Sequence, residues 1–180
     1  MEAPDLKTYP NPCLRVKTKK VEFFDQDLKD LSLAMSEVMY ESGGIGLAAP
    51  QIGVGLSVFV LDIGEGLSCF VNPEILESSS KKTRLEEGCL SIPGITVSVA
   101  RPDKIKVRAY DENGKVFLGD YEGLAAKAVQ HEMDHLRGKI IIDYLDPVRY
   151  FFVTRELMSH KNPRKESKCE VVCRVGKRNK

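Results

Sequence analysis

The sequence predicts a single α+β domain, because segments with helical periodicity lie toward its two ends and short apolar strands cluster between them. Strands and helices do not alternate regularly, as they would in a repeating βαβ sheet. A length of 180 residues with 42% hydrophobic residues is sufficient for one well-packed core. No apolar run is long enough to cross a bilayer, so we expect no membrane association.

Three segments have the pattern of helices. In Asp25–Tyr40, apolar residues recur at helical spacing, and Asp25 or Asp27 can cap the first turn. The segment Gly123–Leu136 carries one continuous stripe of residues, which consists of Leu124, Ala128, His131 and His135. Pro147 opens the third helix, which we expect to continue to Met158.

Short runs of apolar and β-branched residues between these helices predict strands. The predicted strands are Leu56–Asp62, Cys69–Val71, Ile95–Val99, Ile105–Tyr110 and Val116–Tyr121. Asp111–Lys115 separates the last two and contains Asn113-Gly114, which favours a hairpin turn because glycine accepts the positive φ that such a turn needs.

Charge is distributed unevenly along the chain. Residues 160–180 carry eight Lys/Arg against two Asp/Glu, a net charge of +6, whereas residues 1–159 carry 19 against 24, a net charge of −5. We therefore predict one domain over residues 1–159, followed by a basic C-terminal tail outside the core. A solvated, disordered tail is favoured over one that contacts RNA phosphates. The overall charge of +1 argues against a DNA-binding protein.

The motif that carries most chemical information is His131-Glu132-Met133-Asp134-His135. On a helix, residues i and i+4 share one face, so both imidazoles can reach one metal ion. Glu132 lies beside that face and can take a proton from water at the metal. The alternative is a solvated helix with two incidental histidines, which we consider much less favoured.

A catalytic metal site needs a third protein ligand. His160 and Glu156 follow the motif, but nothing around either residue indicates a ligand. Upstream, Cys89 offers a thiolate, which is a strong ligand for iron, zinc, cobalt or nickel, and Gly88 lets the backbone approach closely. We favour Cys89 as the ligand over a buried structural cysteine, whereas Cys69 is expected to belong to the core.

A third segment, Gly43–Gln51, is rich in glycine and alanine but lacks the Lys-Ser/Thr pair of a phosphate-binding loop. Its small residues could let an extended substrate backbone lie close, and the Gln51 amide could donate a hydrogen bond to a developing oxyanion. Taken alone, the segment favours a plain loop between a helix and a strand.

Together, Gly44–Gln51, Glu87–Ser91 and Gln130–Gly138 resemble, in this order, the three signature motifs of the peptide deformylase family. The resemblance covers about Asp5 to Pro147. It implies an α+β fold in which antiparallel β-sheets pack around a central H-E-x-x-H helix. It also implies a reaction, the hydrolytic removal of the formyl group from the N-terminal formyl-methionine of newly synthesised polypeptides, which releases formate.

The resemblance also implies roles for individual residues. The residues that match the metal ligands are Cys89, His131 and His135. Glu132 matches the general acid/base, and Gln51 with the backbone N–H of Leu90 matches the oxyanion stabilisers. The implied metal is one divalent ion, natively Fe²⁺, which Zn²⁺, Co²⁺ or Ni²⁺ can replace.

Substrate contacts are expected from the glycine-rich segments and from the metal-binding helix. These candidate residues are Gly44, Ile45, Gly46, Gly88, Leu124 and Ala128. Ile45 and Gly46 would pair with the substrate backbone as an added strand, and Leu124 and Ala128 would line an apolar slot for the methionine side chain. Lys127 stands where we expect the family to have an apolar residue; its stem can cover the slot while its ammonium reaches the pocket rim.

Two alternatives stay open on the sequence alone. One is a hydrolase with the same motifs that acts on a different acyl group. The other is a metal-stabilised binding module whose basic tail contacts ribosomal RNA; we treat such contact as an addition to catalysis, because an inert module would not need Glu132. The N-terminus shows no secretory or transit signal, so we expect the cytoplasm of a bacterium, or a mitochondrion or plastid if the chain is a processed eukaryotic protein.

Overall fold

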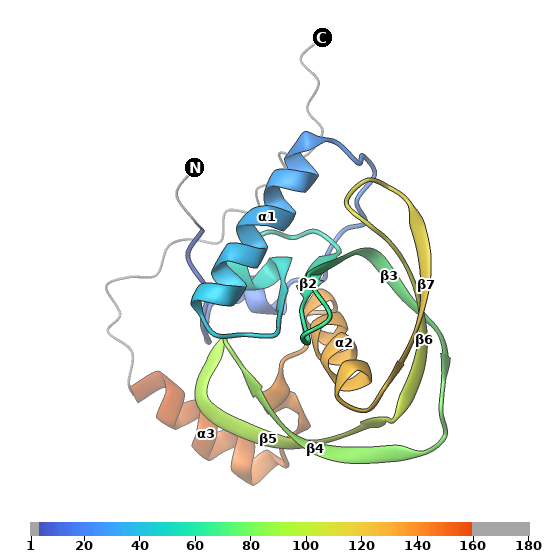
Figure 1. Ribbon diagram of the computed structural model, residues 1–180. Coiled ribbons are helices and arrows are strands. Elements are labelled where there is room, and N and C mark those ends of the chain that lie inside the picture. Colours follow the sequence, from blue (N-terminus) through green and yellow to red (C-terminus); the bar gives the residue numbers. More distant parts are fainter. Residues whose placement is uncertain (1–3, 160–180) are drawn as a thin grey trace.

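The computed structural model describes residues 4–159; the basic tail, with Cys169 and Cys173, lies outside the described residues, so the expectations for it stay predictions. The helix α2 (Gly123–Leu136) lies at the centre of the molecule, and β-strands curve around it (Figure 1). Every strand pair is antiparallel. The predicted α+β class, with antiparallel sheets around the helix that contains His131 and His135, is therefore confirmed.

The larger sheet has five strands in the order β1-β2-β3-β6-β7. Their bounds are Gly46–Ala48 (β1), Val58–Leu61 (β2), Ser68–Ser78 (β3), Lys104–Tyr110 (β6) and Val116–Glu122 (β7). The predicted turn joins β6 to β7, where Asp111 Oδ1 accepts hydrogen bonds from the backbone of Asn113 at 2.9 Å and of Lys115 at 2.8 Å.

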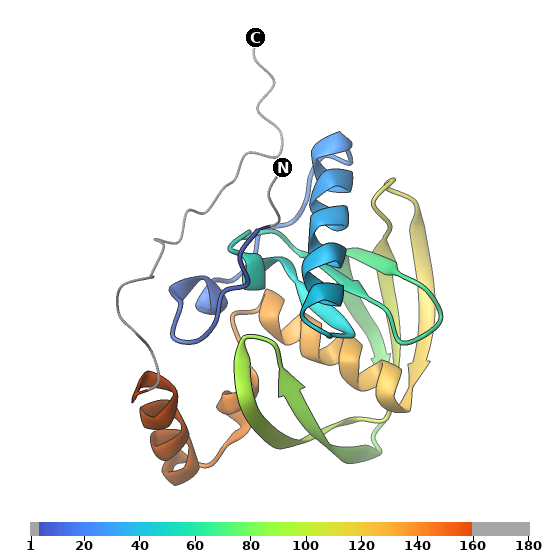
Figure 2. The ribbon, with the colours of Figure 1, turned by 60° about the vertical axis from the view of Figure 1, so that its left-hand side comes forward.

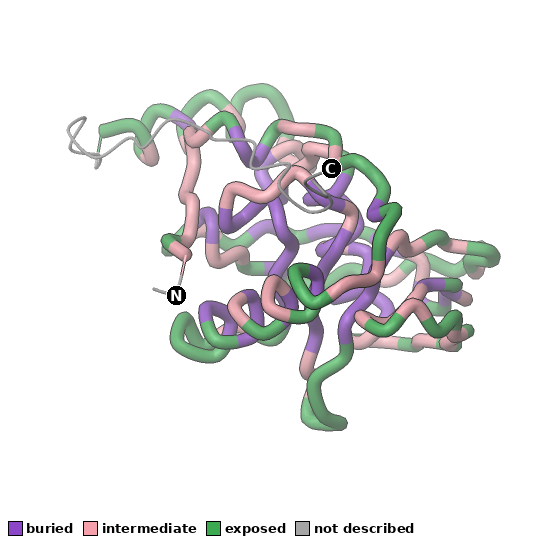
Figure 3. The backbone as a smooth tube through the Cα atoms, turned by 90° about the horizontal axis from the view of Figure 1, so that it is seen from above, coloured by how far each residue is buried: buried purple, intermediate pink, exposed green. Residues whose placement is uncertain are grey.

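The centre of this sheet is buried on both faces, because one helix covers each face. Side chains alternate along a strand, so Val58 and Val60 pack with α1 (Gln26–Glu41), whereas Phe59 and Leu61 pack with α2. This double burial explains why β2 is a continuous apolar run instead of an alternating one. Buried positions concentrate at the middle of the molecule, and exposed positions follow its outer loops and helix surfaces (Figure 3).

A separate hairpin of β4 (Lys82–Cys89) and β5 (Ile92–Pro102) closes the other side of α2 (Figure 1). Its apolar side chains, together with Leu14 and the short helix η3 (Ile141–Tyr144), form a third buried cluster. The C-terminal helix α3 (Pro147–Ser159) packs against this cluster from outside (Figure 2). Two further short 3₁₀ helices, η1 (Pro12–Arg15) and η2 (Ala49–Ile52), complete the described chain.

The three predicted helices are confirmed within one residue at each end. The Asp25 cap is confirmed as well, because its carboxylate accepts a hydrogen bond from the backbone of Leu28 at 3.2 Å. The predicted strands all exist, but β3 and β5 are longer, and β1 and β4 were not predicted. β4 lacks an apolar run because it lies in a two-stranded hairpin with much of its length exposed.

Within residues 4–159, no helix combines the length and the apolar character that a membrane span requires.

Candidate metal centre

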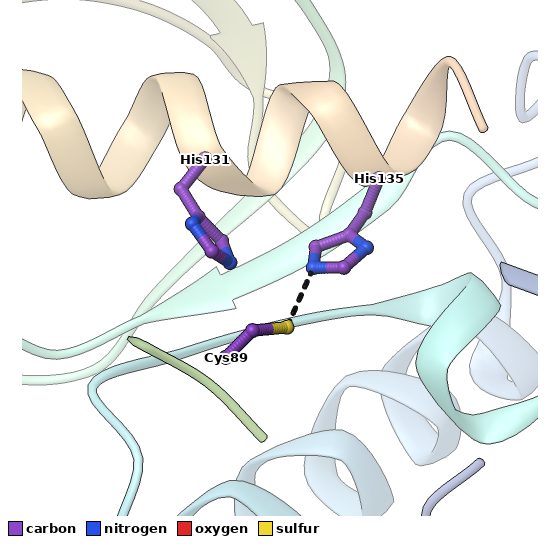
Figure 4. Close-up of side chains that lie close together, drawn as sticks. All are labelled: Cys89, His131 and His135. Carbon is purple, nitrogen blue, oxygen red and sulfur yellow. Dashed lines mark hydrogen bonds between the residues drawn. The ribbon is translucent and has the colours of Figure 1, made fainter. Parts of the chain in front are cut away.

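The helix α2 directs His131 and His135 toward Cys89, the last residue of β4 (Figure 4). The potential ligand atoms of these three residues all lie within 4.8 Å of one another. Among them, Cys89 Sγ lies 3.3 Å from His135 Nε2. Cys89 on β4 and the two histidines on α2, 42 and 46 positions later in sequence, thus present one thiol and two imidazoles to a common point.

In each imidazole, one ring nitrogen is available to a ligand at this point. His131 Nδ1 lies 3.0 Å from Glu87 Oε2, which leaves its Nε2 available to a ligand. His135 is 1% exposed, and burial keeps its pKa well below the ordinary value, so it is neutral and able to bind a metal. Among the described residues, His135 Nδ1 has no hydrogen-bond partner.

The protonation of His131 also fits a site for a cation. Burial by itself lowers its pKa, but hydrogen bonds to Cys89 and Glu87 outweigh burial and raise the pKa to about 10. The site therefore attracts positive charge, which a proton on His131 supplies in the metal-free protein. A divalent transition metal would displace that proton, and a thiolate with two imidazoles is a suitable donor set that leaves a coordination position open.

A buried ionic network fixes the position of His131. The Arg101 guanidinium donates to both carboxylate oxygens of Glu87, at 2.6 and 2.9 Å, and to Asp134 Oδ2 at 2.7 Å. Tyr144 donates to the same Asp134 oxygen at 2.6 Å. Although burial opposes ionisation, the hydrogen bonds from His131 and Arg101 hold the pKa of Glu87 below its ordinary value. Glu87 is therefore an anion that orients the His131 ring.

Glu87 and Asp134 both lie within recognised motifs, but neither was given a role from the sequence, and Arg101 was not identified. Glu87 lies two residues before Cys89 on β4, but the sequence did not predict this strand, so strand alternation could not indicate its role. No sequence pattern identified Arg101, because its partners are 14 and 33 positions away.

Glu132 lies between the two candidate histidine ligands in sequence and is buried in the structure. It is 4% exposed, and burial raises its pKa to about 7 against the opposing effects of His131 and Arg101. Its Oε2 has no hydrogen-bond partner within residues 4–159. A carboxyl group with this pKa can accept and return a proton near neutral pH.

Gln51 is 1% exposed and held at both ends of its amide. Its Oε1 accepts a hydrogen bond from the Ala48 backbone at 2.8 Å, and its Nε2 donates to Ser91 Oγ at 3.1 Å. The same nitrogen lies 3.7 Å from Cys89 Sγ. The amide donor is therefore directed to the side of the site where Cys89 lies.

A cavity of about 400 Å³ lies in front of these residues. Its lining includes every predicted site residue except His135: Gly44, Ile45, Gly46, Gln51, Gly88, Cys89, Leu90, Leu124, Ala128, His131 and Glu132. Ile45 and Leu124 are 46% and 56% exposed. The structure thus brings the predicted residues together, with Ile45 and Leu124 in exposed positions on the cavity wall.

Two glycines allow the backbone to approach its neighbours closely. A Cβ atom at Gly46 would lie 2.6 Å from Glu132 Oε1, and one at Gly44 would lie 2.7 Å from the Leu90 side chain. Both distances are too short for a real contact. A side chain at Gly46 would therefore displace the buried Glu132 carboxyl group, and one at Gly44 would displace the end of the Leu90 side chain.

The ammonium group of Lys127 does not lie where the sequence predicted it. Its side chain lines the cavity, but the residue is only 5% exposed and its ammonium does not reach the rim. The ammonium instead donates a hydrogen bond to Thr83 and pairs with Asp103 at 3.6 Å. The expectation of a charged group at the pocket rim was therefore wrong, because the ammonium pairs with the buried carboxylate of Asp103.

The sequence profile of the polypeptide deformylase family matches residues 4–150. Peptide deformylase 1 of Burkholderia multivorans is 46% identical over 144 residues, which cover 78% of this chain and 80% of that protein. The Thermotoga maritima enzyme is 41% identical over 153 residues, covering 85% and 93% of the two chains.

Solved structures of the same family agree with the fold. A Legionella pneumophila peptide deformylase superimposes with a TM-score of 0.81 at 40% identity, covering 88% of this chain and 99% of that one. The Ehrlichia chaffeensis enzyme in complex with actinonin gives a TM-score of 0.87 at 33% identity, covering 90% and 99%. On these matches of sequence and structure, the chain belongs to the polypeptide deformylase family.

Proposed function

We propose that this protein hydrolyses the formyl amide at the N-terminus of N-formylmethionyl polypeptides and releases formate. The observation that carries the proposal is the convergence of Cys89, His131 and His135, with ligand atoms within 4.8 Å, beside the buried carboxyl group of Glu132. This arrangement offers a metal site with an accessible cavity in front of it and an acid/base group at its side.

Cys89, His131 and His135 would hold the metal ion. When bound, a divalent metal supplies Lewis acidity that favours the ionisation of water and polarises the formyl oxygen. The buried Glu87–Arg101 pair keeps the His131 ring in place, so these residues would present the same geometry at each turnover.

Glu132 would move the proton. As a carboxylate it accepts a proton from the attacking water, and as the acid it returns that proton to the nitrogen of the breaking C–N bond. Because the pKa of Glu132 is about 7, the side chain can both take up and release a proton near neutral pH. The oxygen of the added water thus enters formate, and a proton from that water goes to the free amino group, so atoms and charge balance.

The Gln51 amide and the Leu90 backbone N–H would stabilise the developing oxyanion. Gln51 is fixed by its bonds to Ala48 and Ser91, so its donor needs no reorganisation during the reaction. The backbone at Gly44, Ile45 and Gly46 would pair with the peptide as an added strand, because β1 is the outermost strand of the larger sheet. The methionine side chain would then occupy the slot beside Leu124 and Ala128.

The direct test is formate release from a formyl-Met peptide by protein purified without air, with acetyl-Met and free Met peptides as controls. We expect formate from the formyl peptide and no product from the acetyl peptide, because the formyl carbon bears only hydrogen whereas the methyl group of an acetyl carbon hinders attack. Hydrolysis of the acetyl peptide at an equal rate would instead favour a hydrolase of another acyl substrate.

We further propose Fe²⁺ as the native metal, which the family resemblance supports and which a thiolate with two imidazoles accommodates. Metal analysis of the anaerobic protein should find about one iron per chain, the number of sites that the cluster offers. Air should then abolish activity while the iron is retained as Fe³⁺. Zinc in the active protein, with no response to air, would contradict the assignment.

The substrates of this reaction are made where ribosomes start chains with formyl-methionine, so we propose the bacterial cytoplasm or an organelle as the site of action. Contact between the basic tail and ribosomal RNA is a separate proposal, supported by its eight cationic residues. Deleting residues 161–180 should remove a salt-sensitive affinity for ribosomes. An unchanged affinity after deletion would reject the contact.

A further inference from the structure

Besides the contact of Cys89 with His135, two side-chain contacts connect β4 to α2, and Leu85 of the cavity wall lies between these two. Thr83, Leu85 and Glu87 alternate along β4 and so share the face toward α2. Thr83 bonds to Lys127 and Glu87 bonds to His131, one helical turn farther along α2. Leu85 stands between these contacts and lines the cavity, as do Lys127 and His131.

Lys127 therefore borders the cavity on the side away from the metal-binding residues. Its side chain contributes to the lining, whereas Thr83 and Asp103, which hold its ammonium, do not line the cavity. The aliphatic stem thus faces the cavity and the charge points away from it. This is the opposite of an exposed lysine, whose charge would reach water.

The Asp103 carboxylate is held in place as the counter-ion of this ammonium. Its Oδ1 accepts a hydrogen bond from the Thr83 hydroxyl at 2.8 Å and lies 3.6 Å from Lys127 Nζ, while its Oδ2 pairs with Lys81 at 3.3 Å. The hydrogen bonds from Thr83 and Lys81 hold the pKa of Asp103 below its ordinary value, so the carboxylate stays charged. The Lys127 and Asp103 residues are 5% and 9% exposed, whereas the Lys81 side chain is 74% exposed.

We infer that Asp103 is a specificity-determining residue of the side-chain slot, because it holds the Lys127 ammonium outside the cavity and so leaves the slot selective for an uncharged first side chain. The inference rests on the proposed function. The ligand class is an N-formyl peptide whose first residue is apolar or neutral, and the class that is rejected has an acidic first residue. Without the Asp103 charge, the Lys127 ammonium loses its counter-ion outside the cavity. A carboxylate in the slot would then be its strongest electrostatic partner.

The test compares formyl-Glu and formyl-Gln peptides, whose first side chains have nearly the same shape and differ in charge. In Asp103→Asn, the oxygen that accepts from Thr83 is kept and only the charge is removed. We expect the ratio of kcat/KM for the Glu peptide over the Gln peptide to rise about tenfold, equivalent to about 1.4 kcal/mol. Most of this change should be a lower KM for the Glu peptide, with kcat little altered, since Asp103 does not contact the reacting atoms.

Two further variants show whether Lys127 carries the effect. In Lys127→Met, the ratio should not respond to the additional change Asp103→Asn, because no ammonium is left to release. Lys81→Met is the matched control: it removes the other, exposed partner of Asp103 and should leave the ratio unchanged. Loss of a merely structural contact would lower kcat/KM for both peptides together and leave the ratio constant, which would overturn the inference.

If Asp103→Asn does not fold, Thr83→Val replaces it, because this change removes the other group that binds the ammonium and keeps the side-chain shape. An unchanged ratio in a folded, active Thr83→Val would equally overturn the inference. The two proposals fail in different ways: absence of formate from the formyl-Met peptide with wild-type protein contradicts the function, whereas normal wild-type activity with a constant Glu/Gln ratio contradicts only the role of Asp103.

Discussion

Among single residues, Gly46 shows how closely the backbone of the glycine-rich segment approaches the proton-transfer group. The Gly46 backbone lies so close to Glu132 that an added Cβ would sit 2.6 Å from Oε1. The carboxylate cannot move outward without losing its position beside His131 and His135. The glycine is thus required by Glu132, independently of any contact that it makes with the substrate.

We therefore predict that Gly46→Ala lowers kcat for a formyl-Met peptide by about 100-fold, the lower end of what a positioned acid/base group contributes. Metal content and the thermal unfolding midpoint serve as controls, since the change displaces one side chain and removes no candidate ligand. Wild-type kcat in this variant would show that the position of Glu132 is not critical.

At the scale of elements, a single guanidinium joins two strands and a helix. Arg101 on β5 bonds to Glu87 on β4 and to Asp134 on α2, and all three residues are less than 10% exposed. Such a network is costly to break on one side, because the removal of one charge leaves its buried partners unpaired.

We predict that Arg101→Met lowers the free energy of unfolding by about 3 to 5 kcal/mol in denaturant titrations. Arg108→Met is a matched control: Arg108 also pairs with a glutamate, Glu74, at 2.7 Å, but both side chains are at least 50% exposed. This control should change the free energy by less than about 1 kcal/mol. Equal effects of the two changes would contradict a special role for the buried network.

The limits of sequence reasoning are also clearest at this scale. The helix α2 was predicted to its last residue because Leu124, Ala128, His131 and His135 recur at helical spacing. Strand β4 was missed because Lys82–Cys89 is mostly polar, and its strand character comes from pairing with β5. The candidate ligands lay in recognisable motifs, whereas Arg101 and the Asp103–Lys127 pair depend on distant contacts that leave no local pattern.

For the whole molecule, the candidate metal site joins the β4–β5 hairpin to the central helix. Cys89 comes from the hairpin, and His131 and His135 come from α2. A ligand that binds only the folded state adds stability in proportion to the logarithm of its free concentration. At about 100 times its Kd, a bound metal adds roughly 2.7 kcal/mol.

We therefore predict that chelation lowers the unfolding midpoint by about 5 to 10 °C and that adding Fe²⁺, Co²⁺ or Ni²⁺ restores it. Cys89→Ala should have a midpoint that no longer responds to these metals. A response that persists in Cys89→Ala would place the metal elsewhere in the chain.

The central claim is that one cluster of residues binds the metal and moves the proton, and formate release by metal-loaded Glu132→Ala tests it most directly. Glu132 is not among the three candidate ligands, so the variant should still bind one metal ion per chain. The account predicts that it then releases formate from a formyl-Met peptide at least about 100-fold more slowly than the wild type. Full activity of the metal-loaded variant would contradict the account.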